Sequence, residues 1–243
     1  MDLGLEGRQY LVVGASRGLG QAVAEALESE GASVYKTSRE PASDEFWPLN
    51  TARLDSVEQF VARWGQRPLD GIFVNTGGPP AKPWQTLTLE EWQTAFQQLV
   101  LGPMWLVKEL LGQMNRDASI LFNTSSSVTT PIPGLMLSNV LRPAIHGLAK
   151  TLADELGPAG IRVNVIVPGR IDTERVRTLD QLQAERLQRT LPEVRHASEA
   201  QIPLGRYGLP EEFGRAAAWL LSPAASYIHG AAIRIDGGLI RAL

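Results

Sequence analysis

The sequence predicts an α/β protein with a Rossmann-type, doubly wound parallel sheet in a single domain. Short apolar runs typical of buried strands alternate with helical stretches along the chain. The first of these runs breaks directly into a glycine-rich turn, and a helix-forming stretch follows the turn. No linker, internal repeat or low-complexity tract divides the 243 residues, a length that suits one large α/β domain. We therefore expect residues 1–243 to form one domain.

Apolar runs bounded by turn-forming residues predict strands at Tyr10–Val13, Ser33–Thr37, Ile72–Asn75, Ser119–Asn123, Arg162–Val167 and Ala232–Ile235. A seventh run, Trp47–Leu49, shows the pattern less fully. The stretches between the strands have the apolar periodicity of helices. We expect these helices at Leu19–Glu30, Ser56–Trp64, Leu89–Met114, Leu137–Leu156 and Pro210–Leu221. Helices alternating with such apolar strands indicate a parallel sheet that is covered on both faces.

The glycine-rich turn after the first strand has the features of a phosphate-binding corner. Gly14, Gly18 and Gly20 follow a Gly-x3-Gly-x-Gly spacing rather than the more common G-x-G-x-x-G. Backbone N–H groups at the start of a helix carry partial positive charge, and glycines let a diphosphate approach the backbone closely. A tight strand-to-helix turn without a ligand is the alternative interpretation. Because the motif opens what reads as a βαβ unit, we interpret it as a dinucleotide site.

The segment Asp172–Ile202 differs from the rest of the chain because it is rich in Arg, Glu and Gln and poor in strand signals. Within it, an amphipathic helix is expected over Leu179–Thr190. Late in an α/β domain, such a segment more often covers the ligand crevice than forms a second domain. We therefore predict a substrate lid over residues 172–202, with a merely solvated helix as the alternative. Its arginines would favour an anionic substrate, but nearby acidic residues largely offset them.

Composition and charge exclude several classes of protein. The net charge of −3 gives no reason to expect nucleic acid or an anionic membrane surface as a partner. The chain has no cysteine, which excludes disulfides and thiolate chemistry. His146, His196 and His229 are far apart and lack the spacing of metal ligands, so no metal site is predicted. No apolar run reaches about 18 residues and no signal-peptide pattern is present, so we expect a cytoplasmic protein.

Several short motifs occur in order along the chain: Gly14–Gly20, Asn75–Gly78, Asn123–Ser126, Ile161–Asn164, Pro168–Thr173, Ile202–Glu212 and Asp236–Gly238. In residue types and order they resemble the motifs of the short-chain dehydrogenase/reductase family, including its 3-oxoacyl-(acyl carrier protein) reductase-like members. The resemblance covers essentially the whole chain, and the motifs together are specific for that fold. It implies a nicotinamide cofactor, a small-molecule substrate and a homodimer or homotetramer.

The resemblance also implies which residues contact the cofactor. Transferred position by position, these are Gly14, Ser16, Arg17, Gly18, Leu19, Gly20, Arg39, Asn50, Asn75, Thr76, Gly77, Pro168, Gly169 and Thr173. Asn50 departs mildly from the family pattern, because many relatives have an aspartate there that touches the adenine.

The choice between the two nicotinamide cofactors follows from charge. An NAD enzyme usually has an acid at the end of the second strand to accept the ribose 2′-hydroxyl, whereas a 2′-phosphate needs a cation. This chain has Arg39 close to that point and a second arginine, Arg17, inside the glycine loop. Two guanidinium groups can bind one phosphate through charge-assisted hydrogen bonds. We therefore expect NADP(H), the alternative being that both arginines are solvated surface charges.

The catalytic positions of the family are mostly substituted in this chain. The family uses a serine, a tyrosine that transfers the proton, a lysine four residues later and an asparagine on a neighbouring helix. Ser125 retains the serine, but Ser138 occupies the tyrosine position and Arg142 the lysine position. Leu99 falls where the asparagine belongs. Three of the four catalytic groups therefore differ.

These substitutions leave three hypotheses open. A serine alcohol is a far weaker acid than tyrosine, whose pKa is about 10, and an arginine stays protonated. Arg142 could still stabilise an oxyanion or hold a carboxylate together with Ser125 and Ser138, unless it simply pairs with a local acid. The chain is then an NADP(H)-dependent oxidoreductase with an altered mechanism, or a catalytically silent NADP(H)-binding sensor or regulatory module. A cofactor-free lyase ranks last, because such relatives keep the tyrosine and lose the glycine loop. No replacement proton donor is assigned.

Overall fold

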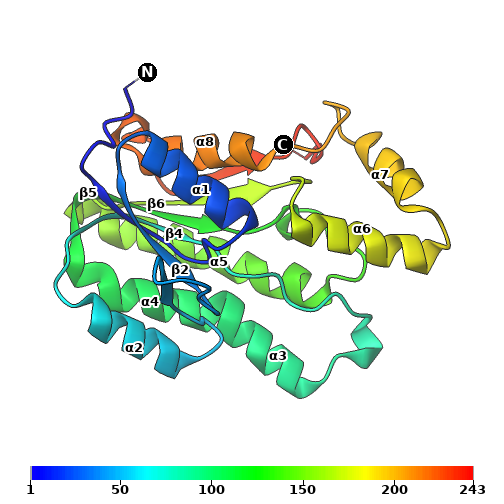
Figure 1. Ribbon diagram of the computed structural model, residues 1–243, viewed down its shortest axis with the longest axis horizontal. Coiled ribbons are helices and arrows are strands. Elements are labelled where there is room, and N and C mark those ends of the chain that lie inside the picture. Colours follow the sequence, from blue (N-terminus) through cyan, green and yellow to red (C-terminus); the bar gives the residue numbers. More distant parts are fainter. Residues whose placement is uncertain (1, 243) are drawn as a thin grey trace.

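Seven parallel strands form the centre of the protein in the computed structural model, which describes residues 2–242 (Figure 1). The strands are β1 Gln9–Val12, β2 Ser33–Ser38, β3 Phe46–Pro48, β4 Leu69–Val74, β5 Met114–Asn123, β6 Arg162–Pro168 and β7 Ala232–Ile235. Their order in the sheet is β3-β2-β1-β4-β5-β6-β7, and every neighbouring pair is parallel. The order reverses between β1 and β4, as in a doubly wound sheet. The predicted fold class is confirmed.

Helices cover both faces of the sheet (Figure 1). One face carries α1 Gly18–Ser29 and α8 Pro210–Leu221, and the other carries α2 Leu54–Trp64, α4 Gly102–Leu110 and α5 Met136–Leu156. The remaining helices are α3 Leu89–Phe96, α6 Glu174–Leu187 and α7 Leu191–Glu199. None of the helices within residues 2–242 is both long enough and apolar enough to cross a bilayer.

Two apolar cores hold the sheet between these helical layers. Successive side chains of a strand point to opposite faces, so Leu11 and Val12 of β1 enter different cores. Leu11 shares its core with Trp64 of α2, whereas Val12 shares the other with Leu27 of α1 and Phe213 of α8. Full burial of each such side chain contributes about 1.5–3 kcal/mol to folding. The cores therefore fix where the carboxyl ends of the strands lie.

All seven predicted strands are present, including the weakest one, Trp47–Leu49, which corresponds to β3. The largest difference concerns β5, which begins at Met114 instead of Ser119. Its first pairing with β4, Leu69 opposite Met114, is followed by a shift in register, so this part of the strand is irregular. The prediction missed this extension because it depends on apolar runs, and the first part of β5 contains polar residues.

The helix predicted over Leu89–Met114 is present from Leu89 to Leu110, but it ends earlier than predicted and is not α-helical throughout. A π-helical turn, Gln97–Leu101, separates α3 from α4, and the last residues belong to a 3-10 turn and to β5. Gly102 packs so tightly that a Cβ atom on it would lie 2.0 Å from the Thr51 carbonyl oxygen. Pro103 has no N–H group to continue the α-helical pattern. A tertiary contact and a proline therefore interrupt a stretch that is helical by composition.

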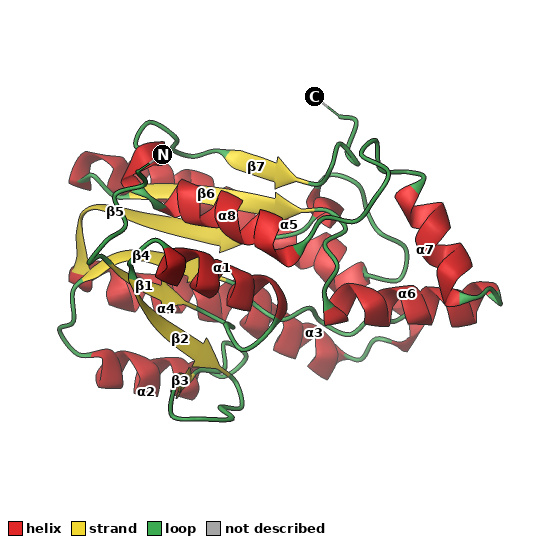
Figure 2. Ribbon diagram, turned by 45° about the horizontal axis from the view of Figure 1, so that its top comes forward, coloured by secondary structure: helices red, strands yellow, loops and turns green. Residues whose placement is uncertain are grey.

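The segment predicted as a lid contains two helices instead of one. The helix expected over Leu179–Thr190 begins earlier, because the Thr173 hydroxyl accepts a hydrogen bond from Val176 N and caps α6. The second helix, α7, starts after Thr190, whose hydroxyl and backbone form a capping box with Glu193. Figure 2 shows α6 and α7 beyond the ends of the strands toward which the strand arrows point.

Candidate functional site

A cleft of about 1880 Å³ opens at the carboxyl ends of the strands. Its walls are the connections that follow β1 to β6, the start of α5, and parts of α6 and α7. Ligands of doubly wound sheets bind at this edge, next to the point where the strand order reverses. The cleft is therefore the candidate functional site.

Polar side chains from three strand ends hold the glycine loop at the edge of this cleft. The Gly14 N–H, on a residue with φ +68°, donates to Thr37 Oγ1 at 3.1 Å. Asn75 Nδ2 donates to the Gly14 carbonyl at 3.1 Å, and Asn123 Nδ2 donates to Asn75 Oδ1 at 2.8 Å. A Cβ atom at Gly20 would lie 2.1 Å from the Gly14 oxygen, so α1 starts directly against the loop. The loop backbone is thus fixed before any ligand arrives.

The first turn of α1 is open to an anion. Arg17 is the N-cap residue, its side chain makes no capping hydrogen bond, and the first turn holds no acidic residue. Gly18 and Leu19, the first helical residues, line the cleft. Unpaired N–H groups at a helix N-terminus bind anions. This arrangement fits the diphosphate of a dinucleotide cofactor.

Most residues that the family resemblance assigns to the cofactor line this cleft: Gly14, Ser16, Arg17, Gly18, Leu19, Arg39, Asn75, Thr76, Gly77, Pro168, Gly169 and Thr173. Gly20 and Asn50 do not line it. Gly20 packs beneath the loop, and the Asn50 side-chain oxygen accepts a hydrogen bond from Ala52 N at 3.0 Å. Leu49 and Thr51, the neighbours of Asn50, do line the cleft. A cofactor contact of Asn50 stays a prediction.

The corner that would hold a ribose 2′-phosphate carries both signs of charge. Arg17 Nη1 lies 2.8 Å from Glu174 Oε2, and both side chains are mostly exposed. Arg39 also lines the cleft and has no carboxylate partner within residues 2–242. Glu40, directly after it, lines the cleft too. Because exposed ion pairs contribute little free energy, a phosphate can compete with Glu174 for Arg17.

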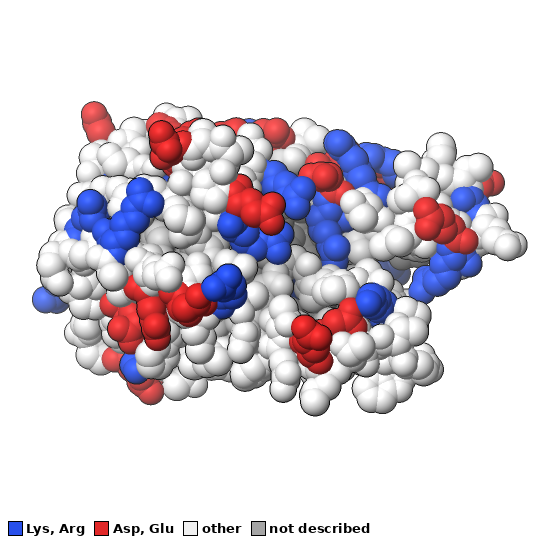
Figure 3. Space-filling view, turned by 60° about the horizontal axis from the view of Figure 1, so that its bottom comes forward, with Lys and Arg blue, Asp and Glu red and all other residues white. Residues whose placement is uncertain are grey.

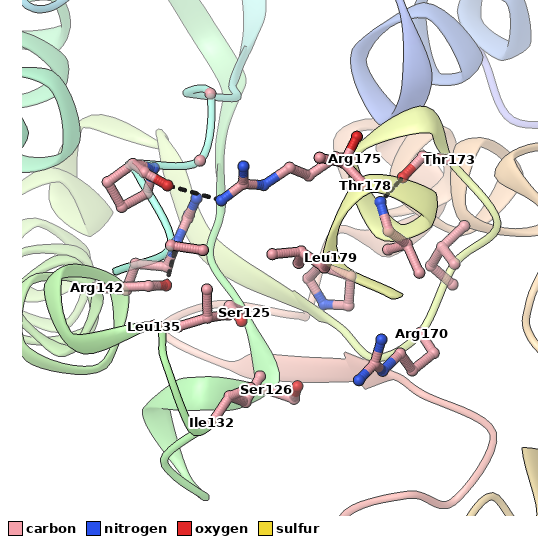
Figure 4. A pocket seen from close by; sticks show the side chains of 18 of the residues that line it. Ser125, Ser126, Ile132, Leu135, Arg142, Arg170, Thr173, Arg175, Thr178 and Leu179 are labelled. Carbon is pink, nitrogen blue, oxygen red and sulfur yellow. Dashed lines mark hydrogen bonds between the residues drawn. The ribbon is translucent and has the colours of Figure 1, made fainter. Parts of the chain in front are cut away.

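Ser125, Ser138 and Arg142 come together where β5 ends and α5 begins. Figure 4 shows Ser125 and Arg142 at this place. Ser125 Oγ accepts a hydrogen bond from Ser127 N at 3.2 Å. Ser138 Oγ lies 3.2 Å from Ser127 Oγ and accepts a hydrogen bond from Arg142 Nε, also at 3.2 Å. Ser138 and Arg142 are one helical turn apart and reach the cleft from the same face of α5. The side chains of Ser138 and Arg142 therefore reach the same small part of the cleft.

Among the residues that the structure describes, Arg142 is a buried cation without an acidic partner. Only 7% of its surface is exposed, and its Nη1 atom donates to the Asn123 carbonyl at 3.1 Å. No carboxylate in residues 2–242 forms a salt bridge with it, so it does not pair with a local acid in the described part of the chain. Burial, together with the positive charge of Arg175, lowers the pKa of Arg142 to about 10. The side chain stays charged at neutral pH.

Arg175 reaches the same volume from α6, and its guanidinium group points toward that of Arg142 (Figure 4). Its Nη2 atom donates to the Pro79 carbonyl at 2.7 Å. The guanidinium group lies against Gly78, where a Cβ atom would come within 2.8 Å of Nε. Burial lowers the pKa of Arg175. The sequence did not single out this residue, because the acidic residues near it in the chain were expected to offset its charge. In the structure, its neighbour Glu174 pairs with Arg17 instead.

The helix position aligned with the family's asparagine does not face the cleft. Leu99 is 2% exposed and belongs to the interior. Gln98, next to it in the π-helical turn, lines the cleft, and its Nε2 atom donates to the Gly77 carbonyl at 2.9 Å. The Gln98 carbonyl accepts a hydrogen bond from Thr51 Oγ1 at 3.1 Å. An amide therefore reaches the cleft from this helix, one residue away from the expected position.

The charge of the cleft is opposite to that of the whole chain, whose net charge is −3. On the face shown in Figure 3, patches of basic and acidic side chains are interspersed. Among described residues, the basic ones that line the cleft are Arg17, Arg39, Lys82, Arg142, Arg170, Arg175, Arg186 and Arg241, and the acidic ones are Glu40 and Glu174. No His, Tyr, Cys or Asp lines it in residues 2–242. That part of the chain also contains no cluster of three or more metal-ligating side chains.

Comparison with known proteins agrees with this geometry. The family model described as "Enoyl-(Acyl carrier protein) reductase" matches residues 14–240. The 3-oxoacyl-[acyl-carrier-protein] reductase FabG of Vibrio cholerae is 29% identical over 252 residues, which cover 98% of this chain and 99% of that protein.

Two solved structures are similar over almost the full length. A short chain dehydrogenase family protein from Francisella tularensis has a TM-score of 0.88 at 27% identity and covers 96% of this chain and 98% of its own. The L-sorbose reductase from Gluconobacter frateurii, solved with NADPH and L-sorbose, has a TM-score of 0.91 at 25% identity, with 100% of both chains covered. The chain belongs to the short-chain dehydrogenase/reductase family of oxidoreductases.

Proposed function

We propose that this protein is an NADP(H)-dependent oxidoreductase that acts on a carbonyl group of a small molecule by an altered mechanism. The observation that carries the proposal is one cleft that holds two different sets of groups. It is lined by the start of α1, with its open amides, and by Ser125, Ser138 and Arg142. Family membership adds support, because a similar enzyme, L-sorbose reductase, was solved with NADPH.

The glycine loop and the first turn of α1 would bind the diphosphate of the cofactor. Arg17 and Arg39 would bind its 2′-phosphate through charge-assisted hydrogen bonds, which favours NADP(H) over NAD(H). Glu40 in the same corner is the one feature that favours NAD(H), since a carboxylate accepts hydrogen bonds from a free 2′-hydroxyl. When bound, the reduced cofactor would supply a hydride.

Arg142 has the central role in the altered mechanism. Ser138 Oγ and the Asn123 carbonyl hold its Nε and Nη1 atoms, and this leaves Nη2 for a ligand. A carbonyl oxygen placed near Nη2 and Ser125 Oγ would gain negative charge beside a cation that is already oriented. Removal of one preorganised donor of this type slows other enzymes by about 100- to 1000-fold. Ser138 is then a positioning residue, because it acts through Arg142.

The source of the proton separates this proposal from its alternative. No side chain lining the cleft in residues 2–242 has a reference pKa near neutrality, and a serine alcohol is too weak an acid to replace tyrosine. In the altered mechanism, Arg142 would stabilise the alkoxide that hydride transfer leaves on the substrate. That alkoxide would then take its proton from hydronium or a buffer acid of the solvent that enters the open cleft. The same observation favours a second candidate, a catalytically silent NADP(H)-binding protein that acts as a sensor or regulatory module.

We also propose that residues 172–202 act as a substrate lid and that the protein forms a homodimer or homotetramer. The lid is supported by the many residues of this segment that line the cleft: Thr173, Glu174, Arg175, Val176, Thr178, Leu179, Leu182, Gln183, Arg186, Ala197, Ser198, Ala200 and Gln201. The oligomer is supported by family membership alone.

Titration with NADPH and NADH, followed by turnover assays, tests the function. The six tryptophans allow binding to be followed by energy transfer to the reduced nicotinamide. We expect submicromolar NADPH affinity, weaker NADH affinity, and NADPH oxidation with part of a panel of aldehydes, ketones, quinones and imines. Both Arg142→Ala and Ser125→Ala should abolish turnover while NADPH still binds.

The other outcomes distinguish the candidates. Tight NADPH binding without turnover of any compound in the panel supports the silent module. Tighter binding of NADH than of NADPH contradicts the roles of Arg17 and Arg39. Absence of binding of either cofactor contradicts both candidates.

A further inference from the structure

The salt bridges of the described residues sort the basic side chains of the cleft into two groups. Lys82 pairs with Glu91, Arg170 with Asp180, and Arg17 with Glu174. Two arginines outside the cleft wall are also paired. Arg177 of α6 pairs with Asp172, and Arg195 of α7 pairs with Asp172 and Glu199. The other basic residues of the cleft have no such partner within residues 2–242. Of these, Arg39, Arg186 and Arg241 are exposed to solvent, whereas Arg142 and Arg175 are substantially buried.

The hydrogen-bond donors of these two arginines are mostly unused. A guanidinium group has five N–H donors. Arg142 uses two of them, for Ser138 and Asn123, which leaves three, and Arg175 uses one, for Pro79, which leaves four. The two groups point toward each other across the cleft (Figure 4). Their free donors therefore converge on one volume.

Two cations brought together out of water destabilise a protein unless an anion joins them. Here the nearest protein acceptors are neutral carbonyls and a hydroxyl, which cannot balance the charge. Arginine forks match the two oxygens of a carboxylate or phosphate. The missing partner is therefore an anion that is not part of residues 2–242.

We propose that Arg142 and Arg175 together bind an anionic group, most simply a carboxylate, on the substrate of this protein. That the bound anion is a substrate rests on the proposed function. The substrate class is then narrowed to carbonyl compounds that carry a negative charge. Ile132, Leu135 and Leu179 line the same part of the cleft (Figure 4), so an apolar body next to the charged group is accommodated.

The diphosphate of the cofactor is the other possible source of such an anion. The proposed diphosphate site lies at the start of α1, after β1, whereas Arg142 is hydrogen-bonded at the end of β5, and β4 lies between these strands. Arg175 is held by the loop after β4. This separation assigns the arginine pair to the substrate, and the experiment must distinguish the two sources.

Calorimetric titration with phenylpyruvate and with its methyl ester tests the pair directly. Both probes have an aromatic body and a ketone, but only the acid carries a charge. With the protein saturated by oxidised NADP+, which cannot reduce the ketone, and again without cofactor, we expect the acid to bind about tenfold or more tightly than the ester, as lost charge-assisted hydrogen bonds predict. Arg142→Met and Arg175→Met should each remove most of this preference. Inorganic phosphate should compete with the acid.

Arg177→Met is the matched control, because Arg177 lies two residues beyond Arg175 on α6, is exposed and pairs with Asp172. It should leave the preference unchanged. Gly78→Ala is a second variant that keeps both charges but moves the Arg175 guanidinium, since the new Cβ atom would come within 2.8 Å of Nε. It should weaken binding of the acid and leave binding of the ester unchanged.

Each remaining outcome decides the question. Equal binding of acid and ester, or no heat from the acid at millimolar concentration, overturns the inference even if NADPH binds and is oxidised. Loss of NADPH affinity by about tenfold or more in Arg142→Met and Arg175→Met assigns the anion to the cofactor and also overturns it. Binding of the acid by a protein that does not bind NADPH would contradict the proposed function but leave the arginine pair intact.

Discussion

At the scale of single residues, the proposed mechanism replaces proton transfer by a fixed charge, held by Ser138 and Arg142. A lysine beside a tyrosine lowers the phenol pKa and lets a proton move, whereas a guanidinium group stays charged over the working pH range. Burial and the nearby Arg175 lower the pKa of Arg142 to about 10, which still leaves it a cation at pH 7. The chemistry that remains is stabilisation of negative charge. How well Arg142 is oriented then depends on Ser138.

Ser138→Ala removes the acceptor of the Arg142 Nε–H, a hydrogen bond of 3.2 Å. We expect anion binding and turnover to fall by about tenfold to a hundredfold, since a hydrogen bond to a charged group contributes about 1.5–3 kcal/mol. Ser138→Thr keeps the hydroxyl and should restore most of the loss. If Ser138 had a purely structural role, Ser138→Ala would lower the unfolding temperature and leave the affinity for phenylpyruvate unchanged. Both quantities are therefore measured.

The lowered pKa of His146 makes the stability of the folded protein depend on pH. The ring is half-buried, its Nε2 atom lies 3.1 Å from Thr124 Oγ1, and burial lowers its pKa. The unfolded chain therefore binds a proton more readily than the folded protein. Stability is fully present above the unfolded pKa of about 6.5 and is lost as the pH falls through it.

His146→Gln should flatten the dependence of the unfolding temperature on pH between about pH 7 and pH 5. Thr151→Ser, an exposed substitution on the same helix α5 that adds or removes no titratable group, is the control and should leave the curve as in the native protein. An unchanged curve in His146→Gln would contradict the assignment of this dependence to His146.

Single residues were predictable from the sequence where a motif specifies the backbone. The loop at Gly14 and the end of β4 at Asn75 were located in this way. Arg175 and Gln98 were not, because their importance depends on which neighbours remain unpaired and which face of an irregular helix turns to the cleft. Such facts arise from packing and not from local pattern.

At the scale of elements, the π-helical turn between α3 and α4 has the clearest consequence. It turns Gln98 toward the cleft and lets Gly102 pack against the backbone of Thr51. Apolar periodicity alone predicts one long helix here, since neither the close approach nor the missing donor of Pro103 alters that periodicity. The seven strands, in contrast, were predictable because strands buried on both faces must be apolar.

Gly102→Ala should destabilise the protein, because its Cβ atom would lie 2.0 Å from the Thr51 carbonyl oxygen and backbone must move. Overpacking of this kind costs about 1–3 kcal/mol in unfolding free energy. Urea unfolding measures the change. Gly147→Ala is the control, since this glycine of α5 has open space around it and alanine favours a helix by about 0.8–1.0 kcal/mol. Equal effects of the two substitutions would contradict the account of the π-helical turn.

At the scale of the whole molecule, the net charge of the chain and the charge of the cleft have opposite signs. The chain carries −3 overall, which on its own would slow the approach of an anionic cofactor. The cleft, lined by more basic than acidic residues, would instead attract it. A cleft focuses the field of the charges that line it, so the local charge should dominate. The sign of the salt effect on association reveals which one does.

We predict that the NADPH association rate falls as ionic strength rises from about 0.01 M to 0.15 M, over which the Debye length shrinks from about 30 Å to 8 Å. Stopped-flow energy transfer from tryptophan measures this rate. Arg186→Gln removes one positive charge from the cleft wall and should lower both the rate at low salt and its salt dependence. Arg215→Gln removes the same charge from the exposed side of α8, outside the cleft, and should leave both unchanged. A rate that rises with salt would mean that the net negative charge governs the encounter, and the positive cleft would then have no role in capturing the cofactor.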